Sequence, residues 1–301
     1  MKADTLVSVL IASYNHNDYI EEAVRSVWLQ PYGYIELIVV DDCSSDNSWE
    51  TICALQAKSP LPMYIAKNEF NMGPAETFNQ AFARSSGELI TFLASDDLFA
   101  TDRLKDSLAQ FEANENLKAL YANGLTFGDG GPRKRIHGKK AIKLLSRSPE
   151  QITRELYINS SPFFIQASLF KRQALEDIGC FDGSLLADDW LLNSRLFASF
   201  DSRLNYDYLD QDVVNYRHHD YNVHKNYERH ERLKIEFIEC HTPSALKLEG
   251  FSNIYYWAAR QRLQQKDFSM AWRYYCQAQK AHFRFSRLRY CFNHIKALIV
   301  K

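Results

Sequence analysis

The chain has 301 residues, of which 46% are hydrophobic and 24% are charged, and its formal net charge is −1. This is the composition of an ordinary globular protein, and no stretch approaches the roughly 18 unbroken apolar residues of a membrane-spanning helix. The length suits one large domain with an appendage, or two domains. The six cysteines form no CxxC pair, which favours reduced thiols in a cytoplasmic protein over a disulfide framework or a cysteine-based metal site.

The two ends of the chain carry opposite charge. Residues 1–221 contain 21 Lys and Arg against 31 Asp and Glu, whereas residues 254–301 contain 10 Lys and Arg and a single acid, Asp267. The sequence therefore has an acidic body and a basic tail. No Gly/Ser-rich linker separates them, so we expect the tail to dock on the body.

The first 120 residues alternate between strand and helix patterns. The expected strands are nearly continuous apolar runs, at Leu6–Ala12, Ile35–Asp41, Met63–Ala66, Glu88–Ala94 and Lys118–Ala122. The expected helices have an apolar period of 3.6 or a capping start, at Asp18–Trp28, Asp46–Gln56, Ala75–Ser85 and Thr101–Ala113. Pro74 is expected at the first position of the third helix. Because such strands must be covered on both faces, the pattern predicts an α/β fold with a mostly parallel central sheet flanked by helices.

Polar clusters follow three of these strands, at Ser13-Tyr14-Asn15, Asp41-Asp42 and Ser95-Asp96-Asp97. In open parallel sheets, ligands bind outside the carboxyl ends of the strands. Two adjacent carboxylates at such an end suit Mg²⁺ or Mn²⁺, which takes oxygen ligands and substrate phosphates, although Asp is also favoured in the first turn of a helix. The chain lacks GxGxxG after its first strand and lacks GxxxxGK[ST] altogether, so dinucleotide and P-loop functions lose their main support.

The middle of the chain, residues 128–162, has the pattern of a loop-rich segment. Gly128–Pro132 is rich in turn residues, and a basic cluster runs from Arg133 to Lys140. The cluster is either a solvated loop or a cationic lid beside a phosphate site. The elements expected after it are a strand at Phe163–Phe170, a helix at Lys171–Ile178, a helix that begins near Asp188 and a strand at Val213–Arg217.

Two further clusters carry residues suited to catalysis. Asp188-Asp189 is either an ordinary helix N-terminus or the source of a general base. Tyr216-Arg217-His218-His219 ends the last expected strand with an imidazole that can bind a metal and a guanidinium that can bind phosphate.

Taken in order, these motifs resemble a family-2 nucleotide-sugar glycosyltransferase with the GT-A fold, of the bacterial surface-glycan type. The resemblance spans residues 6–222 and rests on Val9–Asn15, Val39–Asp46, Asn71–Ala75, Ser95–Asp97, Gly179–Asp182, Asp188–Trp190 and Tyr216–His219. It implies a nucleotide-sugar-binding and catalytic domain at residues 1–222. Residues 223–301 are expected to form a helical, basic C-terminal region.

The resemblance also implies a role for each site residue. The donor-binding residues would be Ala12, Tyr14, Asp42, Asn71, Asp96 and Arg217. Among these, Tyr14 would stack on the nucleotide base and Asp42 would accept a hydrogen bond from it. Asp97 and His219 would hold Mn²⁺ or Mg²⁺ on the diphosphate. Asp189 would deprotonate the acceptor hydroxyl, which then attacks the anomeric carbon in line and inverts its configuration.

The expected function is an inverting, metal-dependent glycosyltransferase that moves one sugar to a glycan acceptor, lipid-linked in surface polysaccharide or lipopolysaccharide synthesis. Two alternatives stay open: a catalytically inactive homologue that acts as a binding or assembly subunit, and a sugar-phosphate nucleotidyltransferase. The second would normally have a Gly-rich, basic loop after the first strand, which Ser13–Asn17 is not. The lack of a QxxRW motif argues against a processive synthase. Asp188 stands where the family more often has Glu, and Ala12 where it often has a hydroxyl residue.

The segment Ala281–Lys301 interleaves aromatic and aliphatic residues with arginines and lysines. A basic amphipathic helix of this kind is typical of membrane surfaces, where each Lys or Arg is attracted to anionic lipid by about 1 kcal/mol. The segment is expected either to hold the protein at the inner face of the cytoplasmic membrane or to pack on the acidic body. Nucleic acid is not an expected partner, since no nucleic-acid-binding fold is evident.

Overall fold

In a computed structural model of the chain, the described residues are 4–128, 132–183, 188–219 and 227–284. They divide into two compact units. The first comprises residues 1–153 and 161–225, and the second residues 154–160 and 226–301.

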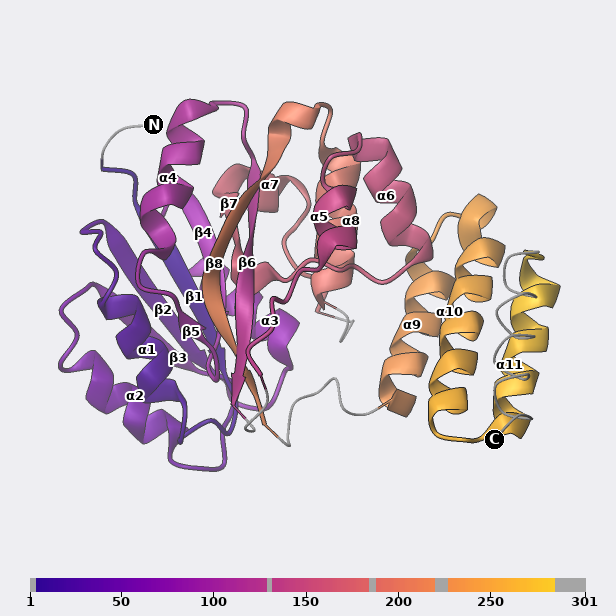
Figure 1. The fold of residues 1–301 in the computed structure, drawn as a ribbon. Helices are drawn as coiled ribbons and strands as arrows, with labels where there is room; N and C mark the ends of the chain where they lie inside the picture. Colours follow the sequence, from indigo (N-terminus) through magenta and orange to yellow (C-terminus); the bar gives the residue numbers. More distant parts are fainter. Residues whose placement is uncertain (1–3, 129–131, 184–187, 220–226, 285–301) are drawn as a thin grey trace. The chain divides into compact units, whose positions relative to one another are not determined.

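The first unit is built around a single sheet, whose strands are β1 (Val7–Ser13), β2 (Ile35–Asp41), β3 (Met63–Lys67), β4 (Leu89–Ala94), β5 (Leu98–Phe99), β6 (Ala119–Gly128), β7 (Ser168–Lys171) and β8 (Tyr206–His218). The eight described strands lie in the order β3-β2-β1-β4-β7-β6-β8-β5 (Figure 1). The pairs β3-β2, β2-β1, β1-β4 and β6-β8 are parallel. β7 is antiparallel to β4 and β6, and β5 is antiparallel to β8. The expected α/β class is confirmed, with β7 joining two parallel parts of the sheet.

The register of the parallel strands brings their carboxyl ends together. Ser13 at the end of β1 pairs with Asp41 at the end of β2, and Ala12 pairs with Ala94 at the end of β4. The polar residues that follow these strands therefore emerge at one edge of the sheet. This is the edge where open α/β sheets bind ligands.

Helices cover the sheet and form the second unit. The helices of the first unit are α1 (Ile20–Trp28), α2 (Ser48–Gln56), α3 (Pro74–Ala83), α4 (Arg103–Ala113), α5 (Lys139–Leu144), α6 (Pro149–Ile158), which continues into the second unit, α7 (Arg172–Asp177) and α8 (Asp188–Ser199). The second unit adds α9 (Tyr227–His241), α10 (Ser244–Gln264) and α11 (Phe268–Ala281). Pro74 is the first residue of α3, as expected, because the first turn of a helix needs no backbone N–H donor there.

Three sequence predictions are corrected here. The segment expected to be loop-rich contains α5 and α6, because Ile152 and Leu156 bury one side of α6. The strand expected at Phe163–Phe170 begins only at Ser168, after a 3₁₀ turn at Ile165–Ala167. The last strand begins at Tyr206, earlier than expected, because it pairs along the whole of β6.

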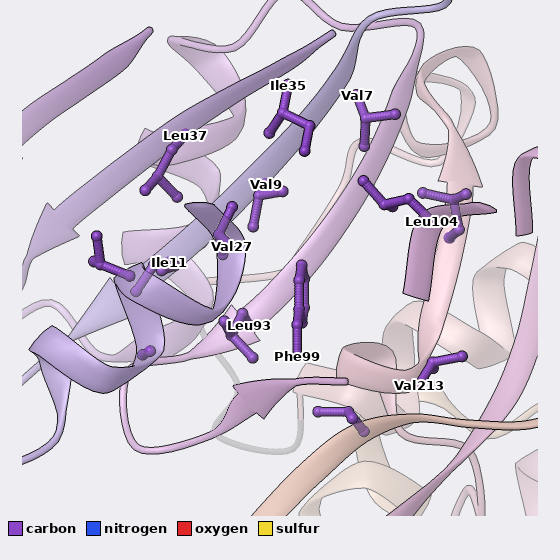
Figure 2. Close-up of a cluster of buried hydrophobic side chains, with 14 of the residues drawn as sticks. Val7, Val9, Ile11, Val27, Ile35, Leu37, Leu93, Phe99, Leu104 and Val213 are labelled. Carbon is purple, nitrogen blue, oxygen red and sulfur yellow. The ribbon is translucent and has the colours of Figure 1, made fainter. Parts of the chain in front are cut away.

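A hydrophobic core cluster lies between the sheet and α1, α2 and α4. Figure 2 shows Val7, Val9 and Ile11 of β1 in one cluster with Val27 of α1 and with Phe99. Alternate residues of β1 and β2 contribute to this cluster, as the period of two in a strand requires. Burial of this face of the sheet against the helices supplies much of the hydrophobic free energy that stabilises the first unit.

The opposite face of the sheet is covered by aromatic side chains. Phe92 of β4 lies 5.2 Å from Phe78 of α3 and 5.1 Å from Phe181, measured between ring centroids. Both contacts are edge-to-face, the arrangement that aromatic pairs favour. The sheet is thus covered on both sides, as the continuous apolar runs of its strands predict.

The second unit is a helical assembly with its own polar contacts. Thr242 donates a hydrogen bond of 2.8 Å to the Tyr157 carbonyl, and Asn253 donates one of 3.0 Å to the Ile158 carbonyl. Glu249 pairs with Arg154 and Arg284. A helical C-terminal region is therefore confirmed. The amphipathic helix expected at 281–301 lies outside the described residues from position 285 onward, and α11 itself ends at Ala281. None of the helices in the described ranges combines the length and apolar character needed to cross a bilayer.

Candidate functional site

The loops after β1 and β2 are tied to each other. Asn15 and Cys43 have positive φ angles of 52° and 61°, which turn the chain sharply as it leaves each strand. The Asn15 N–H donates to Ser44 Oγ at 2.9 Å, and the Ser45 N–H donates to Asn15 Oδ1 at 2.8 Å. Tyr14 is left 46% exposed at this edge, where its ring is open to a planar ligand.

Asp42 organises the loop that follows β3. Its carboxylate is buried and accepts hydrogen bonds from Asn68 Nδ2 at 2.8 Å, Met72 N at 2.8 Å and Gly73 N at 2.9 Å. Gly73 has a φ of 85°, a conformation that favours glycine. A carboxylate has about four acceptor positions, so one remains for a ligand. The same contacts place the exposed Asn71 beside Asp42.

Asp96 and Asp97 meet Arg217 because β5 follows them directly. Leu98 of β5 pairs with Asn215 of β8, which brings the end of β8 alongside the two acids. The Arg217 N–H donates to Asp97 Oδ1 at 2.8 Å, and Arg217 Nε donates to the Asp96 carbonyl at 2.8 Å. Sequence positions about 120 apart are thereby joined at one edge of the sheet.

The Asp97 carboxylate is fully buried, and its Oδ2 has no hydrogen-bond donor among the described residues. Burial raises the pKa of Asp97 well above its usual range, and the neighbouring Asp96 charge adds to the effect. A buried carboxylate oxygen without a partner is costly. It is the group at this site that most needs a cation.

Three side chains near the acids could hold a metal ion: His16, Asp96 and His219. One potential ligand atom from each lies within 4.8 Å of those of the other two. His219 Nε2 is 2.9 Å from Asp96 Oδ2, and His16 Nδ1 is 2.7 Å from Ser95 Oγ. Burial lowers the pKa of His16, so its imidazole is neutral at pH 7, the form that binds metals. Two imidazoles and one carboxylate are ligands that divalent transition-metal ions take.

The side chain of Arg217, next to this cluster, is held by contacts on several sides. Its guanidinium carbon lies 4.9 Å from the ring centroid of Tyr19 and 4.5 Å from that of Phe127. Arg217 also pairs with Glu22 at 2.5 Å. Tyr19 stacks on His219 with 5.3 Å between ring centroids. These contacts fix both members of the Arg217–His219 pair against the loop after β1.

Asp189 lies in the first turn of α8, next to the turn that precedes β7. The Ile165 N–H donates to Asp189 Oδ2 with 3.5 Å between nitrogen and oxygen, and Asn193 Nδ2 donates to the Asp189 carbonyl at 2.7 Å. Burial raises the pKa of Tyr216, and the charges of Asp97, Asp96 and Asp189 raise it further.

The predicted site residues thus fall into three sets. Asp96, Asp97, Arg217 and His219 are joined directly, Asp42 holds the loop that contains Asn71, and Asp189 lies apart in the first turn of α8, beside Ile165. Ala12 lies at the end of β1 between β2 and β4, and Tyr14 two residues beyond it. The roles assigned to these residues stay predictions.

The sequence patterns assigned no role to His16 or to Tyr216. His16 stands within the polar segment Ser13–Asn17 directly after a strand, and Tyr216 directly precedes Arg217. Both positions had a signal, since residues at the carboxyl ends of strands face the ligand edge. Neither could be chosen over its neighbours without the tertiary contacts.

Comparisons with known sequences show the family to which the chain belongs. A profile described as Glycosyl transferase family 2 matches residues 8–179. A Campylobacter jejuni relative named GalNAc(5)-diNAcBac-PP-undecaprenol beta-1,3-glucosyltransferase is 29% identical over 171 residues, covering 57% of this chain and 53% of the relative. An Escherichia coli relative named UDP-Glc:alpha-D-GlcNAc-diphosphoundecaprenol beta-1,3-glucosyltransferase WfaP is 34% identical over 118 residues, covering 39% and 45%. The matches to the curated relatives thus span about half of each relative's length or less.

Solved structures with the same fold cover nearly the whole chain. S. aureus TarS 1-349 in complex with UDP-GlcNAc has a TM-score of 0.64 and 19% identity, covering 97% of this chain and 87% of that one. The mannosyltransferase PcManGT from Pyrobaculum calidifontis, in complex with GDP-Man and Mn²⁺, has a TM-score of 0.60 and 18% identity, covering 98% and 81%. These likenesses confirm the GT-A-like fold.

Proposed function

Because the chain belongs to glycosyl transferase family 2, we propose that it transfers a single sugar from a nucleotide diphosphate-sugar to a hydroxyl of a glycan acceptor, with inversion at the anomeric carbon. The observation that supports this most is the contact of Asp96 and Asp97 with Arg217 and His219. This contact joins Asp96 and Asp97, which lie inside the matched residues 8–179, to Arg217 and His219, which lie after them in the chain. The family match argues against a sugar-phosphate nucleotidyltransferase.

The donor nucleotide is proposed to bind where the loops after β1, β2 and β3 meet. Tyr14, 46% exposed, stacks on the base, and Asp42 accepts a hydrogen bond from a ring N–H with its remaining acceptor position. Asn71, in the loop that Asp42 holds, lines the same pocket. Ala12 offers no hydroxyl, so this part of the base is recognised through shape and backbone groups.

The diphosphate is proposed to bind at the acids. Asp97 and His219 would hold Mn²⁺ or Mg²⁺. His219 belongs with His16 and Asp96 to the group whose potential ligand atoms lie within 4.8 Å of one another, and Asp97, which is next to Asp96 in the chain, is outside that group. When bound, the ion acts as a Lewis acid that stabilises the negative charge of the leaving nucleoside diphosphate. The Arg217 guanidinium lies beside these acids, where its Nε donates to the Asp96 carbonyl. The Arg217 backbone N–H donates a hydrogen bond of 2.8 Å to Asp97 Oδ1.

The acceptor hydroxyl is proposed to lose its proton to Asp189. The carboxylate at the start of α8 is oriented by the Ile165 N–H, and the helix N-terminus favours its ionised form. Tyr216 stays protonated because burial raises its pKa, so it can donate a hydrogen bond to an oxygen of the substrate. The deprotonated hydroxyl attacks the anomeric carbon from the side opposite the diphosphate, which inverts the configuration.

The acceptor is proposed to be a lipid-linked glycan. Relatives from Campylobacter jejuni and Escherichia coli are named for undecaprenol diphosphate-linked substrates. An enzyme with such an acceptor works at a membrane surface, at the inner face of the cytoplasmic membrane in a bacterium.

The test is a transfer assay on the full chain. Nucleotide sugars that raise the unfolding temperature in the presence of Mn²⁺ are incubated with undecaprenol diphosphate-linked acceptors, and the product is analysed by mass spectrometry and NMR. We expect one added sugar with an inverted anomeric configuration. A retained configuration would contradict the Asp189 mechanism, and a donor that binds but is never transferred or hydrolysed would identify an inactive homologue.

A further inference from the structure

A buried polar pair lies inside an aromatic cluster between β6 and α8. Tyr121 of β6 and Asn193 of α8 are both fully buried, and the Tyr121 hydroxyl donates a hydrogen bond of 2.8 Å to Asn193 Oδ1. The Tyr121 ring lies 5.1 Å from that of Phe163 and 5.6 Å from that of Phe197, measured between centroids. An amide and a phenol lose their hydrogen bonds to water in such surroundings, and an apolar pair of similar shape would stabilise the core at least as well. Stability alone therefore does not explain the pair.

The amide of Asn193 ties the first turn of α8 to the segment before β7. Asn193 Nδ2 donates to the Asp189 carbonyl at 2.7 Å and to the Phe163 carbonyl at 3.4 Å. Both carbonyls require the NH₂ group of the amide, which leaves Oδ1 to accept from the Tyr121 hydroxyl. Tyr121 thus fixes the orientation of the Asn193 amide, and the amide fixes the start of the helix.

The same segment before β7 also contacts the carboxylate of Asp189. The Ile165 N–H donates to Asp189 Oδ2 at 3.5 Å, which is a long hydrogen bond and a weak restraint by itself. The first turn of a helix frays readily, because its N–H groups have no partners within the helix. The hydrogen bonds of Asn193 act on the backbone of this turn and therefore limit the movement of the Asp189 Cα, from which the carboxylate projects.

We propose that Tyr121 and Asn193 are positioning residues for Asp189, which hold the first turn of α8 so that its carboxylate meets the acceptor hydroxyl. The inference rests on the proposed function, in which Asp189 removes the hydroxyl proton. Neither Tyr121 nor Asn193 contacts the substrate in this role. Displacement of a reacting group by about 1 Å can lower a rate about 100-fold. Loss of the restraint should therefore lower turnover and leave donor binding, which is assigned to other elements, unchanged.

Tyr121→Phe in the full chain tests the proposal, because it removes only the hydroxyl. We expect kcat to fall about tenfold or more, while the dissociation constant of the donor, measured by calorimetry, stays the same. Tyr206→Phe is the matched control: Tyr206 is also buried, its ring lies 4.9 Å from that of Phe197, and its hydroxyl donates to the Arg147 carbonyl. The control should lower the unfolding midpoint and leave kcat unchanged. An unchanged kcat in Tyr121→Phe, or an equal fall in both variants, would overturn the proposal.

The double variant Tyr121→Phe/Asn193→Leu separates positioning from stability. It removes both members of the pair together, so that no polar group of either side chain is left unsatisfied in the core. We expect its unfolding midpoint to lie above that of Tyr121→Phe, while its kcat stays at least about tenfold below that of the unmodified chain. Recovery of kcat together with the unfolding midpoint would show that the pair serves stability alone.

Hydrogen exchange of the ligand-free protein tests the restraint without the reaction. Residues 188–199 should exchange faster in Tyr121→Phe than in Tyr206→Phe or the unmodified chain, at a temperature where all three are folded. Unchanged exchange in a chain that transfers sugar would overturn the positioning role and leave the proposed function intact. Faster exchange in a chain that transfers no sugar would contradict the proposed function and leave the restraint of the first turn standing.

Discussion

At the scale of single residues, Asp97 shows a conflict between stability and function. Its carboxylate is fully buried beside Asp96, and one oxygen has no donor among the described residues. A core selected for stability alone would not contain such a carboxylate. The free-energy cost of removing its charge from water exceeds the stabilisation that one hydrogen bond from a backbone N–H provides. The arrangement is understandable if a cation completes it.

Asp97→Asn should therefore raise the free energy of unfolding of the ligand-free protein by about 1–3 kcal/mol, because it removes a buried charge and keeps the acceptor for Arg217 N. The same change should weaken metal-dependent donor binding. Chemical denaturation and calorimetry measure the two effects. Asp102→Asn, at an exposed position, is the control and should change neither. A destabilised Asp97→Asn protein would show that the carboxylate is structurally satisfied.

Asp189→Asn should keep donor binding but lower turnover by about 10²–10⁴-fold, the range found for general bases. The amide preserves an oxygen for the Ile165 N–H and cannot accept the hydroxyl proton. Steady-state rates at saturating donor, with calorimetry for donor affinity, separate the two effects. Asp182→Asn alters an acid that pairs with Arg195 at 3.0 Å and serves as the comparison. An unchanged rate would remove Asp189 from its proposed role.

At the scale of elements, the pairing of β6 with β8 requires the backbone of β8 to lie very close to Gly124 of β6. Gly124 of β6 faces Val214 of β8, and a Cβ there would lie 2.7 Å from the Val214 carbonyl oxygen and 2.5 Å from its Cγ1. The register of this pair also shifts between Asn123 and Gly124. A glycine is needed because the neighbouring backbone oxygen has no room to move aside.

Gly124→Ala should lower the free energy of unfolding by about 1–3 kcal/mol, as overpacking does. Since β8 carries Arg217, donor binding should weaken as well. Gly33→Ala is the control, because a Cβ there meets nothing within 4 Å, and it should change stability by no more than about 0.5 kcal/mol. Equal unfolding midpoints for the two variants would contradict the packing argument.

A buried histidine links β6 to the segment before β7. His137 Nδ1 is 2.7 Å from the Ala122 carbonyl, and the Phe164 N–H donates to its Nε2 at 3.1 Å. This pattern requires the neutral ring with its proton on Nδ1. Burial lowers the pKa of His137 from 6.5 to about 4. The next residue, Ile165, donates to Asp189, so the histidine also supports the turn beside the proposed base.

Because the folded pKa of His137 is depressed, the unfolded chain binds the proton more readily. The stability it provides is fully present above pH 6.5 and is lost as the pH falls toward about 4, by up to about 3 kcal/mol. Denaturation midpoints across this range should show the loss. His137→Gln should be less stable at pH 7.5 and have a flatter pH dependence. Parallel curves for the two proteins would exclude His137 as the cause.

At the scale of the whole molecule, donor and metal should stabilise the fold together. A ligand present at 100 times its dissociation constant stabilises the native state by about 2.7 kcal/mol. We expect the nucleotide sugar to raise the unfolding temperature with Mn²⁺ and much less with EDTA. His219→Gln should remove the dependence on metal, whereas His218→Gln, outside the group of candidate metal ligands, should keep it. An equal shift with and without metal would contradict the metal assignment.

Much of the first 120 residues could be predicted. The ends of β2 were predicted without error, and α1, α2, α3 and α4 begin or end within about two residues of their expected positions, because hydrophobic period and caps are local signals. The helix α6 was missed because its apolar side is short. The full length of β8 was missed because it is set by pairing with β6, far away in sequence.

The sequence by itself determined that apolar runs form a sheet clad by helices and that acids follow the strands at Asp42 and Asp97, since both properties are encoded within windows of a few residues. Only the tertiary structure decided that β5 and β8 pair, which brings Arg217 and His219 to Asp96 and adds His16 and Tyr216 to the group. Contacts between residues some 120 positions apart depend on how entire layers pack, and no local pattern of residues encodes that packing.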